Sequence, residues 1–136
     1  PEGPDDIDEP DEEAGIFVDW YTEDYEGITT AGEYIVSNSE YAASYIVFGE
    51  GKVKELQILE LTFKDFNDDG DAVFDIDVAY TIDQLYEDKP IAVWTEFNGT
   101  IPNNGISFLG ADGVRRYYTL AVSGYDGSLI LDRFYP

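Results

Sequence analysis

Cysteine, histidine and methionine are all absent from the 136-residue chain. Because there is no cysteine, no disulfide can form, and packing or a bound ion must hold the fold together. Histidine and cysteine are also the usual general bases, nucleophiles and soft metal ligands, so zinc, copper and iron sites are not expected. The chain has neither a G-x-S-x-G elbow nor a glycine-rich phosphate loop. The sequence therefore predicts a protein that is not an enzyme.

Basic residues are scarce as well: seven lysines and arginines face thirty acidic residues, and the net charge is −23. The negative electrostatic field of this charge repels nucleic-acid phosphates and anionic lipid headgroups, so no nucleic-acid partner is expected. The same field attracts cations and basic proteins, and adaptation to high salt would produce it too. Apolar runs are too short to cross a bilayer, so the sequence predicts no membrane insertion.

The first thirteen residues, PEGPDDIDEPDEE, combine eight acids with three prolines. Like charges repel and prolines prevent regular pairing, so residues 1–13 are predicted to be a disordered tail or spacer. Residues 14–136 keep 22 acids and seven bases, a net charge of −15, and are predicted to form a single β domain. A spacer in this place is typical of a domain held away from a membrane or cell wall.

Short runs of β-branched and aromatic residues fill the rest of the chain. They are separated by turn signals such as Asn104-Gly105, Asp112-Gly113 and Asp126-Gly127, which supply the positive φ of tight hairpins. One helical turn is expected within 81–89 and another within 39–44. Strands are predicted at 15–21, 33–38, 44–49, 53–63, 72–80, 90–97, 105–110, 114–122 and 128–135.

The alternation that predicts a strand is clear in 72–80 and ambiguous in 53–63. In 72–80, Asp75 and Asp77 are expected to point away from an apolar face made by Phe74, Ile76, Val78 and Tyr80. In 53–63, the alternation of Leu59, Leu61 and Phe63 favours a strand, but a helix would also place Val53, Leu56 and Leu59 together.

Strands at this spacing, without a long helical segment, predict an all-β fold: an antiparallel sandwich or small barrel built of short hairpins. In architecture alone, the hairpins toward the C-terminus resemble lipocalin-like and other small β domains of bacterial surface lipoproteins. A β domain on an acidic spacer predicts an extracellular, cell-surface or periplasmic location.

The stretch DFNDDGD, residues 65–71, resembles the first half of a helix–loop–helix calcium loop. Asp65, Asn67, Asp69 and Gly70 match positions 1, 3, 5 and 6 of that pattern, and Asp71 stands at position 7. Position 12 is Ile76, which cannot ligate, so Asp75 or Asp77 would have to replace it. The sequence predicts calcium as a cofactor, with the ligands Asp65, Asn67, Asp69, Asp71 and Asp75. The alternative is a polar hairpin turn that binds nothing.

Aromatic side chains offer a second kind of site. Trp94 and Glu96 share one face of the strand 90–97, opposite Ile91 and Val93, and Tyr21 lies on the polar side of the strand 15–21. Exposed aromatic rings beside carboxylates bind sugars and peptides, so Trp94, Glu96 and Tyr21 are predicted to bind a ligand. Trp94 could instead cover a central strand of the sheet.

Three functions are compatible with these features. The sequence favours a non-catalytic binding or structural module of an exported, surface-associated protein that calcium could stabilise and that binds a carbohydrate or a basic protein. The first alternative is an acidic inhibitor or immunity-type protein that docks a basic partner by charge. The second is a glycoside hydrolase that uses only carboxylates, such as Asp75 and Asp77.

Overall fold

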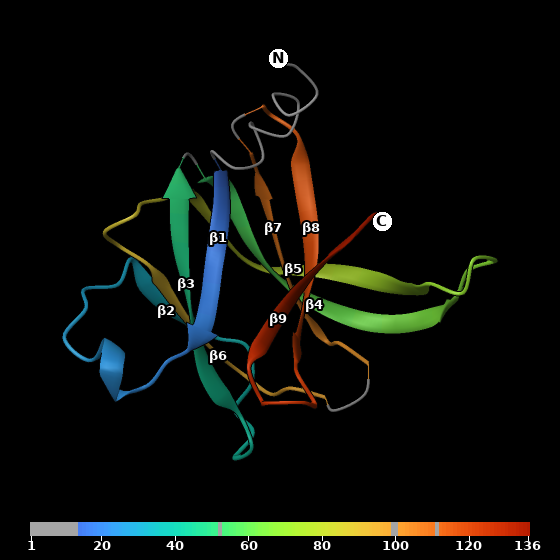
Figure 1. Cartoon of the computed structure of the whole chain (residues 1–136), viewed down its shortest axis with the longest axis horizontal. Helices are drawn as coiled ribbons and strands as arrows, with labels where there is room; N and C mark the ends of the chain where they lie inside the picture. The colour runs from blue at the N-terminus through green and yellow to red at the C-terminus, as the bar shows by residue number, and fades with distance from the viewer. Residues whose placement is uncertain (1–13, 52, 99–100, 111) are drawn as a thin grey trace.

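The computed structural model describes residues 14–51, 53–98, 101–110 and 112–136, and the predicted tail, residues 1–13, lies outside them. The protein is all-β, as predicted, with two sheets packed face to face (Figure 1). A 3₁₀ turn, η2 (Glu23–Tyr25), follows the first strand. The strands in these described ranges are β1 (Ala14–Trp20), β2 (Gly32–Ile35), β3 (Ala43–Gly51), β4 (Val53–Phe66), β5 (Ala72–Leu85), β6 (Ile91–Thr95), β7 (Asn104–Leu109), β8 (Arg115–Val122) and β9 (Leu129–Phe134).

The first sheet, sheet A, has the strand order β1-β3-β6-β2. Its β1–β3 and β3–β6 pairs are antiparallel, but β2 and β6 are parallel. The parallel pair departs from the predicted antiparallel arrangement. It arises because β6 inserts between β2 and β3, which run in opposite directions, and a strand in that place must be parallel to one of them.

The second sheet, sheet B, is antiparallel throughout, in the order β5-β4-β7-β8-β9. Its first hairpin is longer than the sequence predicted, because β4 and β5 have 14 residues each. The end of this hairpin, residues 62–75, projects beyond the body of the protein (Figure 1) and is called the arm below. The predicted helical turn within 81–89 is wrong for 81–85, which continue β5.

The core lies between the inner faces of the two sheets. Phe108 of β7 is buried there and its ring stacks on that of Tyr118 of β8, with centroids 5.7 Å apart. The buried core residues are Tyr45, Val47, Ile91 and Val93 of sheet A, and Val53, Leu56, Ile58, Leu85, Ile106, Phe108 and Leu120 of sheet B.

The first strand and the last hairpin are tied together at one edge of the sandwich. The indole Nε1 of Trp20 in β1 donates a hydrogen bond to the carbonyl oxygen of Gly127, 107 residues later in the chain, at 2.8 Å. The ring of Trp20 also packs edge-on against that of Phe97, at 5.1 Å. Gly127 has a φ of 78°, the left-handed conformation that the Asp126-Gly127 turn requires.

A bulge in β4 explains the ambiguous spacing of that segment. The pairing of β4 with β7 shifts register between Lys54 and Gln57, and Glu55 adopts a positive φ of 49°. The extra residue lets Val53 and Leu56 both reach the core although they are three positions apart. The helix-like spacing in the sequence is therefore the signature of a bulged strand.

A second bulge, in β5, corrects the predicted alternation of 72–80. Ile58 lies opposite Tyr80 and Leu59 opposite Val78, so Ala79 is an extra residue without its own partner. Tyr80 consequently packs against the core, whereas Val78 lies on the other face of sheet B. The sequence predicted that Tyr80 and Val78 share one face, which is wrong because a bulge reverses the alternation.

Sheet B therefore carries a second apolar face, turned away from the core. Register places Leu59, Leu61 and Phe63 of β4 opposite Val78, Ile76 and Phe74 of β5, and Leu59 and Leu61 are buried. Successive ring centroids on this face are 5.0 to 6.4 Å apart. We call this series the aromatic row, and its members are Phe66, Phe63, Phe74, Phe134 and Tyr117.

One ion pair fixes the loop between β7 and β8. The guanidinium of buried Arg116 donates to both carboxylate oxygens of Asp112, at 3.0 and 2.8 Å. This hydrogen bonding, with a further bond from the backbone N–H of Val114, lowers the pKa of Asp112 to about 2. Gly110 leaves the space that the guanidinium occupies.

Candidate functional site

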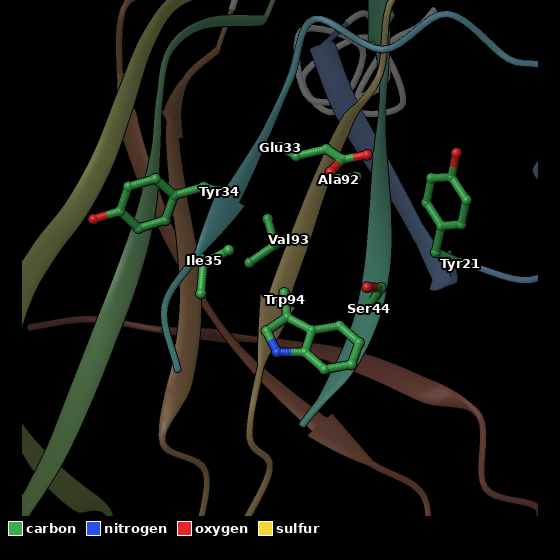
Figure 2. Close-up of a pocket in the computed structure, with 8 residues that line it drawn as sticks. All are labelled: Tyr21, Glu33, Tyr34, Ile35, Ser44, Ala92, Val93 and Trp94. Atoms are coloured by element: carbon green, nitrogen blue, oxygen red, sulfur yellow. The ribbon is translucent and has the colours of Figure 1, made fainter. Parts of the chain in front are cut away.

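A small hollow opens on the outer face of sheet A, with a volume of about 120 Å³. Neighbouring strands build it, because Ile35 of β2 and Ser44 of β3 both pair with Trp94 of β6. Paired residues in a sheet share a face, and this face is opposite the core residue Val93. Tyr21, directly after β1, completes the lining on the far side of β3 (Figure 2).

The hollow combines an aromatic surface with polar groups. The side chain of Trp94 lies across β6 towards Ser44, with Glu33 on the same side of the sheet (Figure 2). Trp94 is 37% exposed, which leaves part of the indole open to a ligand. Tyr34 points the other way, and its ring stacks on that of Tyr80 at 5.0 Å.

The loop after β1 positions Tyr21. The rings of Tyr21 and Tyr25 lie 6.4 Å apart, and Tyr25 in turn packs against Phe48 of β3. The Tyr25 hydroxyl donates a 2.6 Å hydrogen bond to Asp19 Oδ2, and this bond to a carboxylate raises the pKa of Tyr25. A 3₁₀ turn in the 21–31 loop thus holds aromatic side chains against the outer face of sheet A.

The structure brings together two of the three predicted ligand-binding residues, Tyr21 and Trp94. Glu96 is outside the lining of the hollow. Its Oε2 accepts a 2.6 Å hydrogen bond from Ser39 Oγ, and its carbonyl oxygen accepts bonds from the side-chain amides of Asn103 and Asn104. Sequence reasoning missed Glu33, because its place beside Trp94 depends on the parallel pairing of β2 with β6.

The predicted calcium loop lies at the tip of the arm. The Oδ1 atom of Asn67 accepts hydrogen bonds from the backbone N–H groups of Asp69 and Asp71, both at 2.9 Å. Gly70, with a φ of 85°, closes the turn by donating to the Asn67 carbonyl. Asp75 lies in the following strand and forms a 3.6 Å ion pair with Lys64. Over the described part of the chain, no group of three or more acidic side chains is arranged to hold a metal ion.

Calcium binding at the arm therefore stays a prediction, which a thermal melt can test. Calcium should raise the melting temperature more than magnesium, because magnesium requires a tighter octahedron and loses water reluctantly. Asp65→Ala and Asp69→Ala should abolish the rise. Asn67→Ala should lower stability even with a chelator present, by up to about 1 kcal/mol, since two exposed backbone N–H groups exchange Asn67 Oδ1 for water. Equal responses to calcium in the wild type and both aspartate variants would contradict the site.

Comparison with known proteins places the chain in no family: no protein-family model matches it, and neither curated proteins nor solved structures show a significant match. None of the residues in the described ranges forms a helix long and apolar enough to cross a membrane.

Proposed function

We propose that this protein is a non-catalytic binding module of an exported, surface-associated protein, and that the hollow on sheet A binds a neutral carbohydrate. The observation that carries the proposal is the meeting of Tyr21 and Trp94 at one hollow, from segments more than seventy residues apart in sequence. Aromatic residues with polar neighbours in a concave site are the usual elements of small-ligand recognition.

The dimensions and the charge of the hollow both favour this class of ligand. A volume of about 120 Å³ accommodates part of one sugar ring, so the remainder of a glycan would extend over the open surface. The apolar side of a sugar ring can stack on the indole of Trp94, while its hydroxyls reach Glu33 and Ser44. The net charge of −23 disfavours anionic sugars, which leaves neutral glycans as the better ligands.

The placement of the acidic strand residues supports binding without catalysis. Asp75 and Asp77 are exposed on β5, and neither lines the hollow. A glycosidase needs two carboxylates on either side of a bound glycosidic bond, and exposed neighbours on one strand face do not enclose a substrate.

Trp94→Ala should weaken binding of a neutral oligosaccharide at least tenfold, which corresponds to about 1.4 kcal/mol. The stacking surface is lost, whereas the strand and its core face remain. The measurement is isothermal titration of a panel of neutral oligosaccharides against the wild type and the variant. Tyr41→Ala is the matched control, because Tyr41 is a 78% exposed aromatic residue that does not line the hollow.

Two results would contradict the proposal. If no oligosaccharide of the panel binds the wild type, the module does not recognise neutral glycans. If Trp94→Ala and Tyr41→Ala weaken binding equally, the glycan contacts the surface without using the hollow.

A further inference from the structure

A larger cleft, with a volume of about 780 Å³, lies on the opposite side of the protein, between the arm and the end of β9. The arm contributes Asp71 and Phe74 to its lining, and the C-terminal segment contributes Asp132, Phe134 and Tyr135. The volume is within the range of roughly 300–1,000 Å³ that is typical of ligand sites. Figure 1 shows the arm and the end of β9 leaving the body of the protein on the same side.

The curl of sheet B creates this cleft. β5 and β9 are the two edge strands of the sheet, yet the rings of Phe74 and Phe134 are only 5.9 Å apart. The sheet must therefore bend across its second apolar face until its edges approach each other. Phe74 and Phe134, the two members of the aromatic row that line the cleft, meet at this point, and the lining extends from there to Asn67 and Asp71 at the arm tip.

Carboxylates stand on both walls of the cleft. Asp132 pairs with Thr119 and lies two residues before Phe134, so both acid and ring are on the second face of sheet B. Asp71 lines the wall opposite, at the arm tip, where Asp65, Asp68 and Asp69 add further negative charge. Arg133 is the one basic residue in the described lining.

Arg133 also indicates what the cleft can accommodate. Its guanidinium carbon lies 5.0 Å from the centre of the Tyr135 ring, in a cation–π contact. The ring of Tyr135 is nevertheless 79% exposed, so most of its surface is open to a second cation. A guanidinium supplied from outside could stack on the Tyr135 ring in the same way, and Asp71 and Asp132 line the same cleft.

We propose that this cleft binds an extended, arginine-rich segment of another protein. The rings of Phe74, Phe134 and Tyr135 in the lining provide surfaces on which guanidinium planes and apolar side chains stack, and the carboxylates on both walls pair with the charges. Charge complementarity selects the partner, because every electrostatic feature of the cleft except Arg133 favours a cation. The proposal concerns a different surface from the carbohydrate site and does not depend on it.

The test uses a labelled synthetic decapeptide that alternates arginine with leucine, and binding to the whole chain is followed by fluorescence anisotropy. Two further peptides replace arginine by citrulline, which has the same shape without the charge, or by glutamate. The arginine peptide should bind with an affinity that falls steeply as salt is raised, and the other two should bind at least tenfold more weakly.

Three variants locate the binding. The double variant Asp71→Asn/Asp132→Asn should weaken the arginine peptide at least tenfold. The control Glu23→Gln/Asp24→Asn removes the same two charges from η2, on the far side of the protein, and should change affinity less than twofold (Figure 1). Arg133→Gln should strengthen binding several-fold, because it removes the resident cation and frees the Tyr135 ring.

Several outcomes would overturn the proposal. Equal binding of the citrulline peptide would mean that charge is not recognised. Equal losses in the two double variants would mean that the peptide is attracted by the acidic surface as a whole. Unchanged or weaker binding to Arg133→Gln would mean that cations do not occupy this cleft. Circular dichroism of each variant confirms that the fold is retained before affinities are compared.

Discussion

Phe108→Ala should lower the free energy of unfolding by about 3–5 kcal/mol. The Phe108 side chain is 1% exposed and its ring stacks on that of Tyr118, with only 6° between the planes. Alanine removes most of the buried apolar surface and leaves a cavity that the two sheets cannot fill by collapse. Because domains of this size are stable by roughly 5–15 kcal/mol, the loss would be a large share of the total.

Urea denaturation monitored by circular dichroism measures this effect. Phe66→Ala is the matched control, since it makes the same chemical change at a 58% exposed position on the arm. Its cost should be below about 1 kcal/mol, because little surface is withdrawn from water there. Similar losses at the two positions would contradict the placement of Phe108 in the core.

Gly105→Ala should destabilise the protein by about 1–3 kcal/mol, although it adds a single methyl group. A Cβ atom at Gly105 would lie 2.9 Å from the carbonyl oxygen of Tyr118 and 3.1 Å from Leu61 Cδ1. The carbonyl belongs to the backbone of the neighbouring strand β8, so relief requires a shift of the sheet and not a change of rotamer.

The control for this variant is Gly124→Ala. Nothing lies within 4 Å of a Cβ placed at Gly124, and its φ is not in the left-handed region. Alanine there should be neutral or stabilising by a few tenths of a kcal/mol, because it restricts the unfolded chain. The measurement is the denaturation midpoint of each variant. A stabilised Gly105→Ala variant would show that β7 and β8 have room that the structure does not indicate.

The sequence predicted the position of each strand in the part of the chain that the structure describes, because alternation and turn residues are local properties of the chain. It did not predict that 81–85 extend β5. A helical turn was expected within 81–89, but Ile82 packs against the core and Leu85 is buried in it. Tertiary burial overrode a weak local preference.

Two further features were not predicted. One is the bulge at Ala79, which reverses the alternation of side chains along β5, and the other is the parallel pairing of β2 with β6. Both depend on which strands become neighbours, and the regular alternation of 72–80 gives no sign of the extra residue at Ala79. Many strand registers are possible, and the one that forms is the one that buries the most apolar surface between the two sheets.

In the candidate site, the sequence predicted the exposed aromatic residues. Tyr21 and Trp94 were identified because each lies on the polar face of an alternating strand, and that face is solvent-facing in a sandwich. Glu33 and the cleft beside β9 could not be predicted. The position of Glu33 depends on the order of the strands in sheet A, and the cleft depends on the curl of sheet B.

The hydrogen bond from Trp20 to Gly127 has a consequence for how the protein reaches its folded state. A contact that spans 107 residues requires closing a very long loop, and chains rich in such pairings fold in milliseconds to seconds and not microseconds. On the ribosome, β1 is synthesised first but cannot make this bond until the hairpin that contains Gly127 has emerged. The edge that seals the sandwich is therefore completed only when nearly all of the described chain has been made.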